Sequence, residues 1–290
     1  MEYVLHICVM AGIYVVLAVS LDLLAGYTGL LSLAHAAFFG IGAYSSALIT
    51  VQLGAPIVVG WLAGMAVVAA LSFLISLPSL RLRQDYFVIA TFGFQLVASN
   101  VFENWVRVTR GPLGIANIPQ PAFFGFGVRS QVAFALTSTA IALTTYLVVH
   151  QVTNSPFGRV LRVLREDETF AQSLGKNVYH FKIVVFAVSA AGAAMAGALY
   201  AHYITYIDPS SFTVEESILI ISMVIVGGAG DCRGAVLGAI LLVSFQEILR
   251  FVGLPSSLAA NVRQMCYGLM LVVLMILRPR GLVGRYGFGR

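Results

Sequence analysis

Long apolar runs are the feature that most limits what this chain can fold into. A helix needs about 20 consecutive apolar residues to cross the hydrocarbon core of a bilayer, and such runs recur from one end of the sequence to the other. We place them at 4–24, 33–52, 56–77, 86–102, 131–150, 181–206, 216–230, 235–252 and 264–277. The sequence therefore predicts an all-α integral membrane protein, a polytopic helical bundle with about nine spans, where roughly eight to ten would fit the same runs.

Composition supports the same class. Only 10% of the residues are charged and the mean hydropathy is +0.92, whereas a soluble surface carries about 25% charge. We expect one transmembrane domain, 1–290, because no polar segment is long enough to fold separately. The first run is longer than the roughly 7–15 residues of a signal-peptide core, so we interpret it as an uncleaved span. The basic residues are scattered over short loops, which argues against nucleic-acid binding.

The positions of Lys and Arg predict the orientation, because these residues are enriched in cytoplasmic loops. Three groups of them occur at Arg81 and Arg83, between Arg159 and Lys182, and in the C-terminal tail, while Arg107, Arg110 and Arg129 fall in a predicted outer loop and do not fit the pattern. With nine spans, an N-terminus outside the cell puts all three groups in the cytoplasm. We therefore expect a multi-pass membrane protein with a cytoplasmic C-terminus.

A charged segment at about 155–180 interrupts the apolar runs. Ser155 and Pro156 are typical of a helix start, and Gly175 is typical of a helix end. Between them, apolar residues recur at helical spacing, at Phe157, Leu161, Leu164, Ala171 and Leu174. A helix lying in the membrane interface is one interpretation. The acidic triplet 166–168 would be repelled by anionic lipid, so a surface of mixed charge that docks a protein is the interpretation we favour.

The run LRVLREDETFAQSLG, which ends at Gly175, resembles the cytoplasmic loop by which permease subunits of ATP-binding-cassette importers dock onto their ATPases. An acidic residue, an alanine and a downstream glycine recur in that family, and Glu168, Ala171 and Gly175 match them. The resemblance implies an ATPase-docking loop in this chain. Its candidate residues are Arg162, Arg165, Glu166, Asp167, Glu168, Ala171 and Gly175.

Further stretches extend the resemblance over nearly the whole chain. They are GYTGLLSLAHAAFFGIGAYSSAL at 26–48, RLRQDYFVIATFGF at 81–94, RGPLGIANIP at 110–119 and IVGGAGDCRGAVLGA at 225–239. In this order they resemble the branched-chain amino acid permease family, and its LivM-like more than its LivH-like member. The resemblance implies a permease subunit that translocates branched-chain or related amino acids. Related permeases carry urea, amides or small aromatic and organic acids, so these substrates stay open.

The resemblance also implies partners. They are a second, LivH-like permease subunit, two ATPase subunits and a periplasmic substrate-binding protein, all within the lipid membrane or at its surface. The ATPase subunits would bind ATP and Mg, and this subunit would carry no cofactor and no metal. The chain's own Gly175-Lys176 pair is followed by Asn177 and not by the Ser or Thr of a phosphate-binding loop. We therefore expect a transport subunit that is not an enzyme.

Two glycine-rich breaks precede apolar helices, one in each half of the chain. Glycine exposes backbone that lipid cannot satisfy, so such segments line a transport path or let helices pack closely. Both interpretations stay open. The candidate path residues are Gly26, Thr28, Gly29, Ser32, His35, Gly40, Gly42, Gly227, Gly228 and Gly230.

Polar residues within the predicted spans leave a rival function open. Asp22, His35 and Glu247 would be the ion-binding groups of a secondary transporter driven by protons or sodium. We expect instead that Asp22 is interfacial or paired, and that His35 is a neutral histidine bonded to a neighbouring carbonyl. Gln95 and Asn100 lie five residues apart, which does not form one helix face, so neither is singled out.

Overall fold

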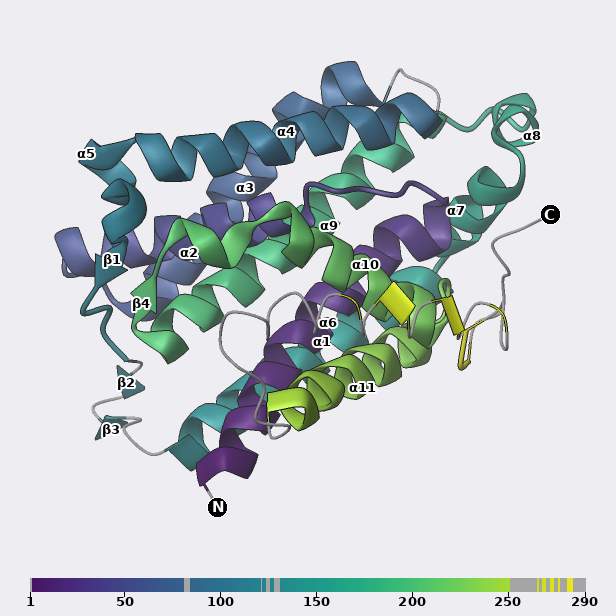
Figure 1. The fold of residues 1–290 in the computed structure, drawn as a ribbon. Coiled ribbons are helices and arrows are strands. Elements are labelled where there is room, and N and C mark those ends of the chain that lie inside the picture. Colours follow the sequence, from purple (N-terminus) through teal and green to yellow (C-terminus); the bar gives the residue numbers. More distant parts are fainter. Residues whose placement is uncertain are drawn as a thin grey trace.

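The structure, a computed structural model, describes residues 2–80, 84–120, 122–123, 126–127, 131–250 and 281–283, with isolated positions between 265 and 276. Helices dominate this part of the chain (Figure 1). In the first half they are α1 (Glu2–Thr28), α2 (His35–Gln52), α3 (Ile57–Ser79), α4 (Gln84–Asn104), α5 (Val106–Thr109) and the short 3-10 helix η1 (Gly111–Leu113). In the second half they are α6 (Gln131–Asn154), α7 (Pro156–Glu166), α8 (Glu168–Ser173), α9 (Val178–Ile204), η2 (Pro209–Phe212), α10 (Val214–Gly227) and α11 (Cys232–Arg250).

Two very short antiparallel strand pairs lie between helices. β1 (Ile115–Ala116) pairs with β4 (Tyr206–Ile207), and Ile115 stands opposite Ile207. β2 (Ala122–Phe123) pairs with β3 (Phe126–Gly127). Figure 1 shows β1 and β4 at one end of the helical bundle, with α7 and α8 at the opposite end. The two ends of the molecule are therefore built from different kinds of structure.

Helices cover eight of the nine predicted apolar runs. Five of them, α1, α3, α4, α6 and α9, are long and apolar enough to cross a membrane. The doubtful run at 86–102 is among the five, as helix α4. By contrast, α2 and α10 have only 18 and 14 residues, and most of the run at 264–277 lies outside the described residues. The protein is thus a polytopic helical membrane protein, and the nine-span count stays a prediction.

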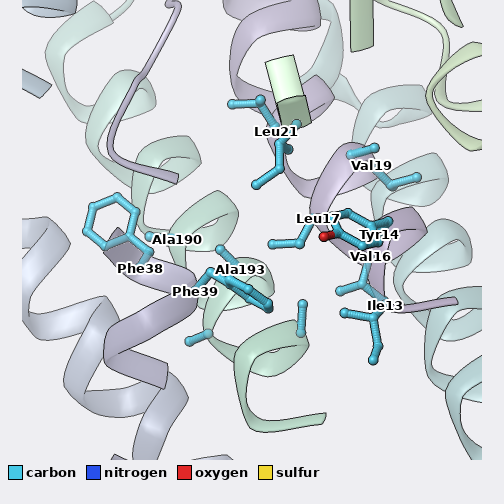
Figure 2. Close-up of a cluster of buried hydrophobic side chains, with 14 of the residues drawn as sticks. Ile13, Tyr14, Val16, Leu17, Val19, Leu21, Phe38, Phe39, Ala190 and Ala193 are labelled. Carbon is cyan, nitrogen blue, oxygen red and sulfur yellow. The ribbon is translucent and has the colours of Figure 1, made fainter. Parts of the chain in front are cut away.

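Helices α1 and α9 form the centre of the bundle. Within their apolar stretches 61% of the residues are buried, against 28% in α3, α4 and α6. Figure 2 shows the core around them, where Leu17 of α1, Phe39 of α2 and Ala193 of α9 come together. Small residues allow this close approach: a Cβ added at Gly197 of α9 would collide with the backbone carbonyl of Phe39. The peripheral helices are left to face lipid.

Contacts at the ends of α1 define the direction of its neighbour α11. The Tyr3 hydroxyl donates to Glu247 Oε2 at 2.5 Å, near the start of α1 and the end of α11. Tyr27 Oη lies 3.4 Å from Cys232 Sγ, near the end of α1 and the start of α11. The two helices therefore run antiparallel. The segment after α11 returns, because Leu282 and Val283 bond the carbonyls of Val226 and Gly227.

Candidate functional site

The charged segment folds as a helical hairpin at one end of the bundle (Figure 1). Ser155 Oγ accepts a hydrogen bond from Gly158 N at 3.4 Å, and Pro156 occupies the first helical position of α7. Gly175 follows α8 with φ of +72°, a conformation that side chains disfavour. The predicted start and end are both confirmed.

The hairpin contains two helices where the sequence predicted one. Asp167 adopts an extended conformation, with φ of −152°, between α7 and α8. Its carboxylate accepts hydrogen bonds from Thr169 N at 2.8 Å and Phe170 N at 3.0 Å. These bonds cap the first turn of α8, so the aspartate competes with a continuous helix for the same backbone donors.

The break changes which apolar residues are buried. Leu164 and Ala171 pack against Val178 at the start of α9, as a small separate core. Leu174 continues the apolar spacing in the sequence, but it is 58% exposed, and Phe170 is 54% exposed. The turn at Asp167 rotates α8 relative to α7, so one helical periodicity cannot hold across both. The result is an exposed apolar pair surrounded by charges, on a surface where apolar groups mark binding.

The charged residues of the hairpin divide into internal and exposed ones. Glu168 pairs with Lys182 of α9 at 2.7 Å, and the lysine side chain is only 7% exposed. Arg162 Nη2 donates to the Thr153 carbonyl at 2.6 Å, at the end of α6. Glu166 is exposed. Glu168 and Arg162 thus fix the hairpin to the bundle, while Glu166 is free to meet a partner.

Arg165 joins the hairpin to the first glycine break. Its Nη1 atom donates to the Gly26 carbonyl, in the last turn of α1. One turn earlier in α1, the fully buried Asp22 accepts from Gly230 N at 2.8 Å through Oδ1. Its second carboxylate oxygen has no hydrogen-bond partner among the described residues, and the Arg165 charge acts on this carboxylate. The hairpin, the end of α1 and the second break therefore meet at one place.

The second glycine break, between α10 and α11, depends on glycine for its backbone conformation and for the close approach of the two helices. Gly228 and Gly230 have φ of +110° and +88°. A Cβ added at Gly227 would collide with the carbonyl of Gly234, so α10 and α11 cross at backbone contact. Glycine is needed at 228 and 230 for the backbone conformation, and at 227 for the close approach of the two helices.

The first break runs from the end of α1 to His35, the first residue of α2. Thr28 Oγ1 donates back to the Leu24 carbonyl at 2.6 Å, and Gly29 has φ of +75°. Ser32 is buried, and its hydroxyl accepts from Ala34 N at 3.3 Å. The non-helical segment thus satisfies its own polar groups within the protein, as backbone at membrane depth must.

His35 is buried and bonds another side chain of α1. Its Nε2 lies 3.1 Å from Ser20 Oγ, which donates its one proton to the Leu17 carbonyl at 2.9 Å. This contact joins the start of α2 to the middle of α1. His35 also has a hydrogen bond to the backbone of Leu17, so the predicted carbonyl partner is confirmed.

Known proteins are similar to this chain over nearly its whole length. The sequence profile of the branched-chain amino acid transport system permease component matches residues 3–276. The chain belongs to this family. The permease is 36% identical to the high-affinity branched-chain amino acid transport system permease protein LivM of Salmonella typhimurium over 304 residues, which cover 96% of this chain and 69% of the relative. It is 34% identical to LivM of Escherichia coli over the same shares.

The LivH permease protein of Escherichia coli is 24% identical over 292 residues, 94% of this chain and 91% of the relative. The predicted likeness to LivM more than to LivH is confirmed. No solved structure matches the chain. As a permease component, the protein is a multi-pass transport subunit of a multi-subunit system and not itself an enzyme, and its family carries no cofactor in this subunit.

Two further glycines of the permease's candidate path lie within helix α2, and packing explains both. A Cβ added at Gly42 would collide with the backbone of Ala194 in α9. One added at Gly40 would lie 2.7 Å from the ring of Phe102 and 2.8 Å from that of Phe212. These contacts require glycine whether or not either residue borders a path, so path lining stays a prediction.

Gln95 is the polar residue of the permease that sequence reasoning undervalued. Its Oε1 accepts from Ala37 N of α2 at 2.6 Å, and its Nε2 donates to the Phe212 carbonyl of η2 at 2.9 Å. Ser217 of α10 reaches the same Oε1 at 3.4 Å. The available signal was an amide inside an apolar run, which is costly in lipid unless it is bonded. Asn100 is exposed and bonds only its own helix.

Proposed function

We propose that this permease is the translocating subunit of an ATP-driven importer of branched-chain amino acids, with α7 and α8 as the surface on which an ATPase subunit docks. The family and the names of the LivM and LivH relatives support the substrate class. The resemblance of the hairpin to a docking loop supports the energy source. Urea, amides and small organic acids are the alternative substrates of the same importer class.

The Arg165 contact is the observation that carries the proposal. A docking loop must transmit the movement of its partner, and a side chain that bonds the Gly26 carbonyl is a direct connection from the hairpin to the transmembrane helices. The Asp22 bond to Gly230 extends this connection to the second break. Movement of the hairpin would then be felt where the helices are interrupted and least rigid.

The remaining parts of the importer follow from this role. A second, LivH-like permease would complete the membrane part, two ATPase subunits would bind ATP and Mg, and a periplasmic protein would deliver the substrate. The hairpin and the C-terminus would lie in the cytoplasm, on the inner face of a bacterial inner membrane. The single domain 1–290 would rock its helices around the glycine breaks, exposing the path to each side in turn. Its candidate lining residues are Gly26, Thr28, Gly29, Ser32, His35, Gly40, Gly42, Gly227, Gly228 and Gly230.

The exposed pair Phe170 and Leu174 gives a sharper test than charge reversal at Glu168. Reversal at Glu168 would place a second cation against the buried Lys182, and so would damage the bundle itself. The Phe170→Asp variant removes only an exposed apolar group. In proteoliposomes with the partner subunits, we expect it to lose ATP-dependent leucine uptake and ATPase binding while inserting normally.

Leu113→Asp is the matched control. Leu113 is 80% exposed and lies in η1 next to β1, at the opposite end of the bundle from the hairpin. It should keep uptake near the unmodified level. Equal ATPase binding by the Phe170→Asp variant and the unmodified chain would reject the docking surface.

A further inference from the structure

A groove on the side of the bundle is apolar along its length. It lies between α1, α6 and α11, which run side by side (Figure 1), and encloses about 690 Å³. Its lining includes Ala11 and Val15 of α1, Leu143 of α6, and Leu237 and Ile240 of α11. These residues follow helical spacing, so the groove is parallel to the helices.

A small polar pocket lies next to the groove, near the hairpin. Arg233 lines both cavities, and the pocket of about 110 Å³ also contains Arg162, His150 and Asn154. Tyr27, Thr153, Gly230 and Asp231 complete its wall. The groove and the pocket are therefore neighbouring cavities joined at Arg233, one apolar along the helices and the other polar at the hairpin end.

The pocket contains a buried donor that lacks an acceptor among the described residues. Arg162 uses Nη2 on the Thr153 carbonyl, but its Nε is buried and has no hydrogen-bond partner among the described residues. Arg233 is exposed at the mouth. Asp231 is the one acidic side chain in this wall, and two guanidinium groups exceed its charge. A buried donor without a partner is costly, so the pocket favours an oxygen-rich anion.

We propose that these neighbouring cavities bind an anionic phospholipid, with its phosphate against Arg162 and Arg233 and an acyl chain along the groove. A phospholipid matches this arrangement, because the lipid carries its charge in the head group at one end and has hydrocarbon along the rest of its length. Basic pockets between transmembrane helices at the cytoplasmic surface bind lipid head groups in the same way. Arginine is suited to the phosphate, since its planar donors form paired hydrogen bonds with phosphate oxygens.

The position of the pocket gives such a lipid influence over transport. Gly230 in its wall bonds Asp22 of α1, and Arg162 belongs to the docking helix α7. A bound phosphate would therefore hold the hairpin, the end of α6 and the second glycine break together. The assignment of this end of the bundle to the cytoplasm rests on the proposed function, whereas the cavities themselves are seen in the structure.

The test is lipid binding by the chain purified in mild detergent with the subunits that stay attached to it. Phosphatidylglycerol or phosphatidylcholine is added in turn, and bound lipid is counted by native mass spectrometry. We expect phosphatidylglycerol to bind more tightly. The Arg233→Gln variant should weaken phosphatidylglycerol about fivefold, the effect of about one basic residue at a membrane surface, and leave phosphatidylcholine unchanged.

Arg107→Gln is the matched control, because this variant removes the same charge from an exposed residue at the opposite end of the bundle. It should bind both lipids as the unmodified chain does. A second variant, Leu237→Trp, should reduce retention of both lipids by filling the groove, with the melting temperature recorded to exclude unfolding.

Three outcomes would overturn the proposal. Equal binding of the two lipids would show that the arginines do not select a charged head group. Displacement of phosphatidylglycerol by inorganic phosphate at equal concentration would identify a site for a free anion. Lipid bound by the lone chain but excluded from the assembled complex would assign the groove to a second permease subunit. None of these outcomes bears on ATPase docking, so the two proposals fail separately.

Discussion

At the scale of single residues, Asp22 is a buried carboxylate of α1 that binds a distant part of the chain through one of its two oxygens. Its Oδ1 accepts from Gly230 N, and both groups are buried. The Asp22→Ala variant should lower the free energy of unfolding by about 1–3 kcal/mol, because it leaves a buried amide without an acceptor. Thermal unfolding of the purified chain in detergent measures the loss, and uptake should fall with it.

The Asp22→Asn variant is the control, because its side-chain carbonyl keeps the acceptor and removes only the charge. We expect its stability and uptake to remain near those of the unmodified chain. If asparagine proves as damaging as alanine, the charge itself is needed. That result would favour the ion-coupled alternative, in which Asp22 binds the driving ion.

At the scale of elements, one amide connects α2, α4, η2 and α10. The Gln95→Leu variant should cost about 1–3 kcal/mol, since it leaves Ala37 N without its side-chain acceptor and removes the shorter of two hydrogen bonds to the Phe212 carbonyl. Asn100→Leu, on the same helix, should stay within about 0.5 kcal/mol because its bond is exposed and local. Chemical unfolding of the two variants in detergent compares them. Equal stabilities would mean that the Gln95 bonds contribute nothing.

The end of α8 depends on backbone conformation and not on space. A Cβ added at Gly175 meets nothing within 4 Å, but φ is +72°. Gly175→Ala should therefore strain the turn by about 1–2 kcal/mol and reduce ATP-dependent uptake. Gly175→Asn should retain more uptake, because asparagine tolerates this conformation better. Alanine and asparagine variants with the same uptake would show that the turn is not strained.

At the scale of the whole molecule, the fold places its docking hairpin and its strand pair at opposite ends (Figure 1), and the hairpin carries the exposed apolar residues Phe170 and Leu174 among charges. A chain built this way should need partners. Reconstituted alone in liposomes with a proton or sodium gradient, it should take up no leucine above empty liposomes. Adding the ATPase and second permease subunits with ATP should restore uptake. Gradient-driven uptake by the lone chain would establish the secondary-transporter alternative.

Part of the fold and of the hairpin follows from local sequence alone. Apolar runs of sufficient length predict helices, and the ends of the hairpin were predicted from Ser155, Pro156 and Gly175, because capping depends on a few neighbouring residues. The family was recognised from motifs in one order. Even the break at Asp167 had a local cause, since aspartate is a strong capping residue, but an uninterrupted apolar spacing concealed it.

Only the tertiary structure decided which polar groups meet. Gln95 bonds residues 58 and 117 positions away, and Asp22 bonds one 208 positions away. No periodicity within one helix contains this information. The same holds for the Arg165 contact with Gly26 and for the arginine pocket beside the apolar groove. The sequence by itself determined a helical membrane permease and the helix boundaries of its hairpin, because hydropathy and capping are local. Packing decided how the hairpin is connected to the glycine breaks, because long-range contacts depend on how helices cross.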